Sequence, residues 1–233
     1  MAVILCLETS TSVCSVALMK AEQVLALRES REGNRYAEML TIFIQEVMEE
    51  AGMRLADIDA VAVSGGPGSY TGLRIGVSMA KGICWSLDKP LMAVPTLQAM
   101  AYGASMMSVP STGKTIYCPL MDARRMEVYC AMFDELLQTV QPVRSEVVCA
   151  TSFSDVEPSH QLVYFGDGMP KSKALLSDRA SAVFLDDFVM SAVHLGRPAA
   201  DAYSARRFEP VARYEPFYFK EFVAGQGSVL PRG

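Results

Sequence analysis

One pattern occurs twice in this chain of 233 residues, and it limits the possible folds more than any other feature. The apolar stretch AVILCLE ends in the carboxylate of Glu8, a polar turn follows, and a second apolar stretch, VCSVALM, comes next. The segment TIYCPLMDARRMEVYCAMFDE repeats this order, so that Asp122 aligns with Glu8 and residues 130–132 align with residues 16–18. Two strands joined by a short turn form a hairpin. The sequence therefore predicts an α/β protein of two related halves, each of which opens with a β-hairpin.

Further elements follow each hairpin. QVLALRES predicts a third strand, and the apolar residues of 36–51 recur at helical spacing, with Gly52 as a left-handed cap. IDAVAVS, residues 73–87 and LMAV predict a strand, a helix and a strand, which form a parallel pair with a right-handed crossover. Thr96 is the expected N-cap of the next helix. In the second half we expect strands near 146–149, 161–165 and 182–185, and helices near 171–176 and over 188–208 with an interruption at 196–198.

The chain divides at a polar stretch near its middle. SVPSTGKT has the composition of a linker. We therefore expect an N-terminal subdomain of residues 1–108 and a C-terminal subdomain of residues 109–208. The aromatic segment YEPFYFKEF predicts that a tail of residues 209–233 packs back on the body.

Composition and charge exclude several classes of protein. The net charge is −5, and the only dense basic clusters are Arg124-Arg125 and Arg206-Arg207, so the chain is not expected to bind tRNA by itself. No apolar run reaches about 18 residues, and AVILCLE leads directly to Glu8, so neither a membrane span nor a signal peptide is expected. The six cysteines form no C-x-x-C pair and lie mostly in apolar runs, which favours buried free thiols in a cytoplasmic protein.

Two familiar motifs fail on spacing. In STGKT the first glycine of a P-loop would fall at Ser108, and a strand follows where a helix is required. The two histidines, His160 and His194, form no H-x-x-x-H pair, which excludes a helical histidine metal site. Each histidine is expected to be a surface or packing residue.

The two aligned carboxylates suggest a cleft between the halves. Duplicated folds of the actin, hexokinase and Hsp70 type hold hydrated magnesium under ATP between two such residues. The alternative interpretation is that the two carboxylates merely cap hairpin turns. Catalysis is disfavoured, because close backbone approach to phosphate requires glycine and the second turn has none. Arg124 or Arg125 could instead pair with Asp122 or Glu8. A vestigial nucleotide cleft would consist of Glu8, Thr9, Ser10, Asp122, Arg124 and Arg125.

The segment SGGPGSYTGLRIG, from Ser64 to Gly76, is rich in glycine. Its N–H groups could bind an anion at a helix N-terminus, but no lysine accompanies it, and a sharp turn with positive φ angles is the favoured alternative. The helix that follows is apolar nearly all round, and Gly76, Ala80 and Gly82 are small enough to let another helix approach closely. One side can meet the sheet, and the other is expected to meet residues 36–51 or a neighbouring subunit.

Five segments together resemble the TsaB family, also called YeaZ, over nearly the whole chain: SGGPGSYTGLRIG, LETSTSVCSVAL, PLMDARRMEVY, YFGDG and YEPFYF. The resemblance implies a duplicated actin-like (ASKHA, Hsp70-like) fold and a non-catalytic subunit that dimerises with a catalytic TsaD-like subunit. That complex makes threonylcarbamoyladenosine (t6A) beside the tRNA anticodon. The resemblance also implies a TsaE-like ATPase in the assembly, homodimers in isolation, tRNA contact only through the complex, and ATP and metal bound by the partners.

Members of the family pair through their N-terminal helices, which implies an interface on residues 36–51 and 72–87. The implied interface residues are Tyr36, Met39, Leu40, Phe43, Leu73, Gly76, Val77, Ala80, Lys81 and Cys84. Relatives commonly have Asp in place of Glu8 and His near Tyr36. The alternative function is a stand-alone ATP-dependent enzyme of the actin-like class, kinase-like or peptidase-like, which would need Glu8 and Asp122 to hold magnesium–ATP.

Overall fold

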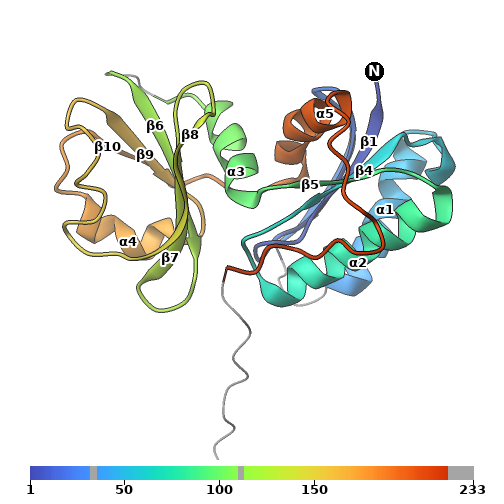
Figure 1. Ribbon diagram of the computed structural model, residues 1–233, viewed down its shortest axis with the longest axis horizontal. Coiled ribbons are helices and arrows are strands. Elements are labelled where there is room, and N and C mark those ends of the chain that lie inside the picture. The colour runs from blue at the N-terminus through green and yellow to red at the C-terminus, as the bar shows by residue number, and fades with distance from the viewer. Residues whose placement is uncertain (32–35, 110–112, 220–233) are drawn as a thin grey trace, which may run out of the picture.

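Two five-stranded sheets form the framework of the molecule (Figure 1). This computed structural model describes residues 1–31, 36–109 and 113–219. The strands are β1 (Val3–Glu8), β2 (Cys14–Lys20), β3 (Gln23–Ser30), β4 (Ala60–Ser64), β5 (Leu91–Val94), β6 (Thr115–Asp122), β7 (Glu127–Phe133), β8 (Thr139–Val147), β9 (Gln161–Phe165) and β10 (Ala182–Leu185).

The two sheets have the same topology. The first has the order β3-β2-β1-β4-β5, and the second, read from its β8 edge, has the order β8-β7-β6-β9-β10. The hairpin strands are antiparallel in both sheets, and the strands that follow are parallel to β1 or β6. This correspondence confirms the predicted duplicated actin-like α/β fold.

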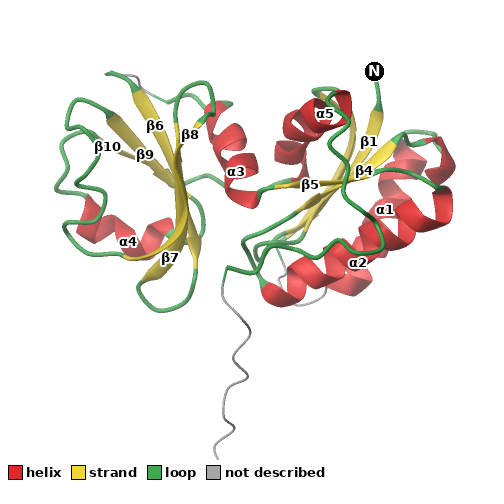
Figure 2. Ribbon diagram, in the orientation of Figure 1, coloured by secondary structure: helices red, strands yellow, loops and turns green. Residues whose placement is uncertain are grey.

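Helices cover the outer faces of both sheets and fill the space between them (Figure 2). They are α1 (Tyr36–Glu50), α2 (Tyr70–Leu87), α3 (Thr96–Ser105), α4 (Met169–Leu176) and α5 (Gly196–Ser204), with the short 3-10 helices η1 (Leu55–Asp57) and η2 (Ala192–Leu195). α1 and α2 pack on the first sheet, and α4 packs on the second. Within the described residues, no helix combines the length and hydrophobicity needed to cross a bilayer.

The ends of the helices follow local chemistry. Gly52 has a φ of +63°, which confirms the predicted left-handed residue after α1. α2 begins three residues before the predicted start, because the Ser69 hydroxyl caps it by accepting a hydrogen bond from the Gly72 N–H (3.2 Å). The prediction that Thr96 is an N-cap is wrong: Pro95 occupies that position, and the Thr96 hydroxyl accepts from the Gly66 N–H (3.2 Å).

Packing in space does not follow the order of the chain. α3, which lies within residues 1–108, packs on β6 and β7 of the second sheet, whereas α5, within residues 109–208, packs on β1, β4 and β5 of the first. The described part of the tail returns to the first half, where the Glu209 N–H donates to the Leu91 carbonyl (2.9 Å). The predicted boundaries at 108 and 208 therefore stay a prediction, and residues 220–233 lie outside the described part.

Three apolar cores hold the layers together. The central core lies between the two sheets and includes Ile4, Cys6 and Phe165. The first outer core lies beneath α1 and α2, and the second beneath α4. Because β1 is buried on both faces, its sequence is a continuous apolar run. Five of the six cysteines are buried free thiols and Cys149 is exposed; burial raises the pKa of Cys6 to about 12, so its thiol stays protonated.

Candidate functional site

The glycine segment before and within α2 is filled by the chain itself. A Cβ atom on Gly68, Gly72 or Gly76 would come within 3.0 Å of the loop that follows β1, a separation that real Cβ atoms essentially never show. Two hydrogen bonds tie the segments together: the Thr9 hydroxyl donates to the Gly72 carbonyl (2.8 Å), and the Ser69 N–H donates to the Ser10 carbonyl (2.7 Å). The glycines therefore let α2 approach the first hairpin turn, and protein backbone occupies the space that a phosphate would need.

A second contact explains Gly66, the second glycine of the segment. A Cβ on Gly66 would collide with the Phe217 carbonyl, and Gly66 also has a φ of +103°, a conformation that other residues rarely adopt. The Phe217 N–H donates to the Gly65 carbonyl (2.7 Å), so the tail runs directly over this turn. The favoured interpretation of the segment as a sharp turn fits these contacts.

Glu8 is fully buried at the end of β1. Its carboxylate accepts hydrogen bonds from the Ser10 N–H (2.6 Å), the Ser10 hydroxyl and the Ser64 hydroxyl. Burial raises the pKa of Glu8, and these hydrogen bonds only partly oppose that effect. A carboxyl group that is fully buried and hydrogen-bonded by its own chain fits a structural role better than a role in binding magnesium.

The protonation of Glu8 leads to a testable pH dependence. Because its pKa is raised in the folded state, the native chain keeps a proton over a pH range in which the unfolded chain has lost it, so the free energy of unfolding falls as the pH rises through that range. Glu8→Gln keeps the acceptor for Ser10 and cannot ionise. We expect the free energy of unfolding of the variant, relative to that of the parent, to increase as the pH rises above the usual pKa of a glutamate, as measured by urea denaturation. Parallel pH profiles of the two proteins would contradict this.

Asp122 does not face Glu8, contrary to the predicted alignment. Glu8 shares the strand face of Ile4 and Cys6 in the central core, whereas Asp122 shares the face of Cys118 and Leu120 in the second outer core. Glu8 lies opposite Ser15 on β2 but Asp122 lies opposite Val128 on β7, so the second connection is one residue shorter. The sequence alignment of the two repeats uses one constant offset, so it cannot show that the second hairpin connection is shorter than the first.

The surroundings of Asp122 are those of a structural ion pair. Its carboxylate binds the Lys171 ammonium of α4 and accepts a hydrogen bond from the Arg124 N–H (2.7 Å). Arg124 and Arg125 have φ angles of 72° and 47°, as expected for the tight turn between β6 and β7. Within the described residues, neither guanidinium forms an ion pair with Asp122 or Glu8, so the predicted pairing is not seen.

The carboxylate that does approach Glu8 is Asp167, in the loop after β9. Its negative charge contributes to the raised pKa of Glu8, and its Oδ1 accepts a hydrogen bond from the Asp122 N–H (3.0 Å). Reduced solvation in the cleft raises the pKa of Asp167 itself, although solvent reaches part of the side chain. The segment YFGDG could have identified Asp167 from the sequence, because Asp167 follows a predicted strand. Residues at the carboxyl ends of neighbouring parallel strands meet at one edge of a sheet.

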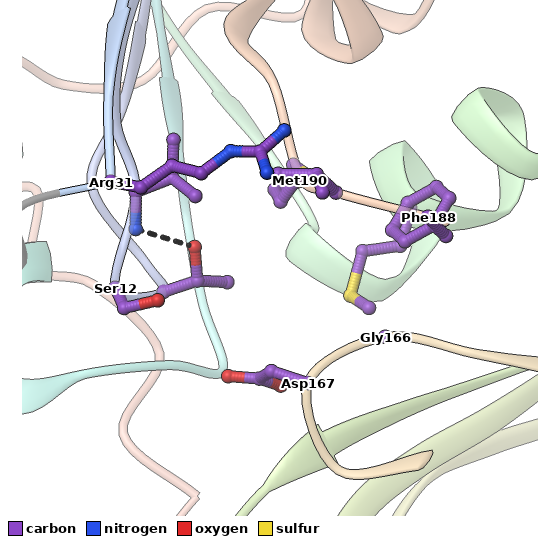
Figure 3. A pocket seen from close by; sticks show the side chains of 10 residues that line it. Ser12, Arg31, Gly166, Asp167, Phe188 and Met190 are labelled. Carbon is purple, nitrogen blue, oxygen red and sulfur yellow. Dashed lines mark hydrogen bonds between the residues drawn. The ribbon is translucent and has the colours of Figure 1, made fainter. Parts of the chain in front are cut away.

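A small cavity of about 180 Å³ lies beside Asp167, between the two halves (Figure 3). It is lined by the hydroxyl-bearing Thr11 and Ser12, by Arg31 and Asp167, and by the apolar Met100, Phe188 and Met190. Ligand pockets for larger molecules usually enclose about 300 to 1,000 Å³. This cavity is smaller than such pockets, and none of the six residues predicted for a nucleotide cleft lines it.

Most of the predicted interface residues are inaccessible. Six are buried in the chain: Leu40, Leu73, Gly76, Val77, Ala80 and Cys84. They face the sheet and the hairpin turn, because the α2 face with the most apolar residues packs against β4. The interface prediction is therefore wrong at these positions.

Four predicted interface residues remain. Met39 and Phe43 are half-buried at the margin of the first outer core. The Lys81 ammonium donates to the carbonyls of Ala212 (3.2 Å) and Tyr214 (3.0 Å), so it holds the tail. The Tyr36 side chain lies outside the described residues.

The opposite face of α2 is open to solvent. Trp85 is 74% exposed, and Gly82 has free space around it. A groove of about 800 Å³ runs between α1, η1 and α2, and its apolar walls include Ile75, Met79 and Leu87. We call this surface the α2 outer face. The sequence signal that marks it is the series Ser78, Gly82 and Ser86, whose spacing of four residues places small side chains on one side of the helix.

Known proteins resemble this chain in sequence and in fold. It is similar to the protein named tRNA threonylcarbamoyladenosine biosynthesis protein TsaB of Bacillus subtilis, at 27% identity over 178 residues, which cover 75% of each chain. It is 37% identical over 132 residues to the Escherichia coli protein of the same name, and the match covers 56% of this chain and 54% of that protein. YeaZ from Pseudomonas aeruginosa superimposes with a TM-score of 0.76 at 24% identity, over 94% of this chain and 100% of that one.

Two topologically equal halves around a central core define the class of duplicated actin-like α/β proteins. The family model of TsaD, described as tRNA N6-adenosine threonylcarbamoyltransferase, matches residues 31–191. Together with its similarity to the TsaB proteins, this match shows that the chain belongs to the TsaB (YeaZ) family.

Proposed function

We propose that this protein is a non-catalytic, cytoplasmic subunit that supports t6A formation in tRNA by docking onto a catalytic TsaD-like subunit. The names of its relatives in the TsaB family support the reaction. A TsaE-like ATPase joins the assembly, tRNA is contacted only through the complex, and ATP and metal are bound by the partner subunits. The free chain forms homodimers through the surface that docks onto the TsaD-like subunit.

The α2 outer face is the observation that carries this proposal. An exposed tryptophan is rare on a soluble monomer and is favoured at the centre of protein interfaces. Because Gly82 has no side chain, a partner helix can approach the α2 backbone closely there. The surface is thus suited to helix-on-helix docking.

The state of the cleft supports the absence of catalysis. The glycine segment is occupied by the hairpin turn, Glu8 is enclosed by serines, and Asp122 is bound by Lys171. Among the described residues, no group of three His, Cys, Asp or Glu side chains is placed to hold a metal ion. His194 is half-buried and stacks on Phe188, and reduced solvation lowers its pKa to about 4, so it is a packing residue.

The proposal predicts that the isolated chain does not bind magnesium–ATP. A triphosphate would have to displace the backbone of the first hairpin turn from α2, which costs two hydrogen bonds and close packing. Calorimetric titration with magnesium–ATP is expected to give no binding heat. Micromolar binding that is abolished by Asp122→Ala would instead support the alternative of a stand-alone ATP-dependent enzyme.

Reconstitution of the modification tests the function directly. TsaD-like and TsaE-like subunits, tRNA and the threonylcarbamoyl donor are incubated with and without this chain, and t6A is measured. We expect product only when the chain is present. Equal product in its absence would contradict a required subunit.

A further inference from the structure

The cavity between the halves is built from five separate segments. The loop after β1 contributes Thr11 and Ser12, the end of β3 is followed by Arg31, and the loop after β9 contributes Asp167. Met100 of α3 and residues 188–190 complete the lining. A ligand in this cavity would therefore contact both halves of the molecule at once.

The lining separates charged and apolar groups. Figure 3 shows Ser12 and the stem of Arg31 on one side of the cavity, with the Arg31 guanidinium extending across to Met190 and the Asp167 carboxylate pointing toward the Ser12 side. Phe188 and Met190 lie on the other side. Within the described residues, no ion pair involves the Arg31 guanidinium. One cation and one anion thus reach the same small space from different segments.

This pattern limits the chemistry of a ligand. A guanidinium binds a carboxylate through a planar fork of donors, and a carboxylate binds an ammonium. A ligand that carries both charges can pair with the guanidinium and the carboxylate at once, whereas a ligand with one charge can pair with only one of them. The volume of about 180 Å³ is close to that of a cavity that accepts benzene, about 150 Å³, so the ligand has few non-hydrogen atoms.

We propose that this cavity binds a small zwitterion, namely an α-amino acid with a short apolar side chain. Its carboxylate lies on Arg31, its ammonium lies between Asp167 and the Ser12 hydroxyl, and its side chain packs on Met100 and Phe188. This site is independent of the α2 outer face and of any nucleotide, so it stands or falls separately from the proposed function.

Calorimetry with three matched compounds tests the site in the full chain. L-Valine carries both charges, isobutylamine lacks the carboxylate, and 3-methylbutanoate lacks the ammonium. We expect L-valine to bind, and each analogue to bind at least about 10-fold more weakly, since one charged hydrogen bond is lost. Absence of L-valine binding at about 10 mM, or equal binding of either analogue, would overturn the proposal.

Two conservative variants locate the binding. Arg31→Gln removes the exposed guanidinium, and Asp167→Asn keeps the oxygen that accepts from the Asp122 N–H while it removes the charge. Each is expected to weaken L-valine binding at least about 10-fold. Arg125→Gln, an exposed cation on the β6–β7 turn, is the matched control and should bind as the parent does. Unchanged affinity in Arg31→Gln or Asp167→Asn would refute the assignment to this cavity.

Discussion

Replacing Gly72 by alanine is expected to lower the free energy of unfolding by about 3 kcal/mol, a large fraction of the stability of an ordinary domain. The added Cβ would overlap the Thr9 carbonyl oxygen, which is part of the backbone and cannot swing aside. Moving the two segments apart would also break the hydrogen bond from the Thr9 hydroxyl to the Gly72 carbonyl. Chemical denaturation followed by circular dichroism measures the loss.

Gly82→Ala provides the control on the same helix. Nothing lies within 4 Å of a Cβ at this position, so only the helix propensity of the residue changes. Alanine is expected to raise the free energy of unfolding by about 0.5 to 1 kcal/mol at the same protein concentration. If both variants were equally stable, close packing of α2 on the hairpin turn would not be the reason for the glycine.

Loss of docking is the second large effect that we expect. Trp85→Ala should weaken binding to the cognate TsaD-like subunit by about 30-fold, because truncation of an interface tryptophan commonly costs about 2 kcal/mol or more. Gly82→Arg should abolish the complex, since a long charged side chain would separate the two helices at their closest approach. Both positions are exposed, so the isolated chain should stay folded. Analytical gel filtration and calorimetry measure the binding.

An exposed apolar residue on the second half serves as the control for docking. Leu136 is 79% exposed and lies in the turn between β7 and β8, far along the chain from α2. Leu136→Arg should leave the affinity for the TsaD-like subunit unchanged. Full affinity in a well-folded Gly82→Arg variant would show that the partner docks elsewhere.

The repeat in the sequence was enough to predict the duplication, because a strand, a turn and a strand are short-range features. β3, β9 and β10 occur at their predicted residues, and α1 ends within one residue of its prediction. The start of α2 was missed because the Ser69 cap lies inside a segment that reads as a loop. The position of α3 on the second sheet could not be predicted, since it depends on packing between distant segments.

The candidate sites show the same difference between what the sequence predicts and what depends on packing between distant segments. Hydrophobicity alone predicted that α2 is apolar nearly all round, but it could not show which of its faces the chain's own sheet covers. The most apolar face, with Leu73 and Val77, is needed by the chain's own sheet. The sequence pairs Asp122 with Glu8, because it does not show that the second hairpin connection is one residue shorter.

By itself, the sequence determined the two-fold repeat, most of the strands and helices, and the family, since these depend on residue patterns that are local or directly comparable. The exceptions are β8, which begins at Thr139, and α5, which begins where an interruption was expected. Tertiary structure decided which side of α2 is free, which carboxylate approaches Glu8, and what fills the space beside the glycines. The physical reason is that side chains alternate along a strand and rotate around a helix, so a shift of one residue exchanges a buried face for an exposed one.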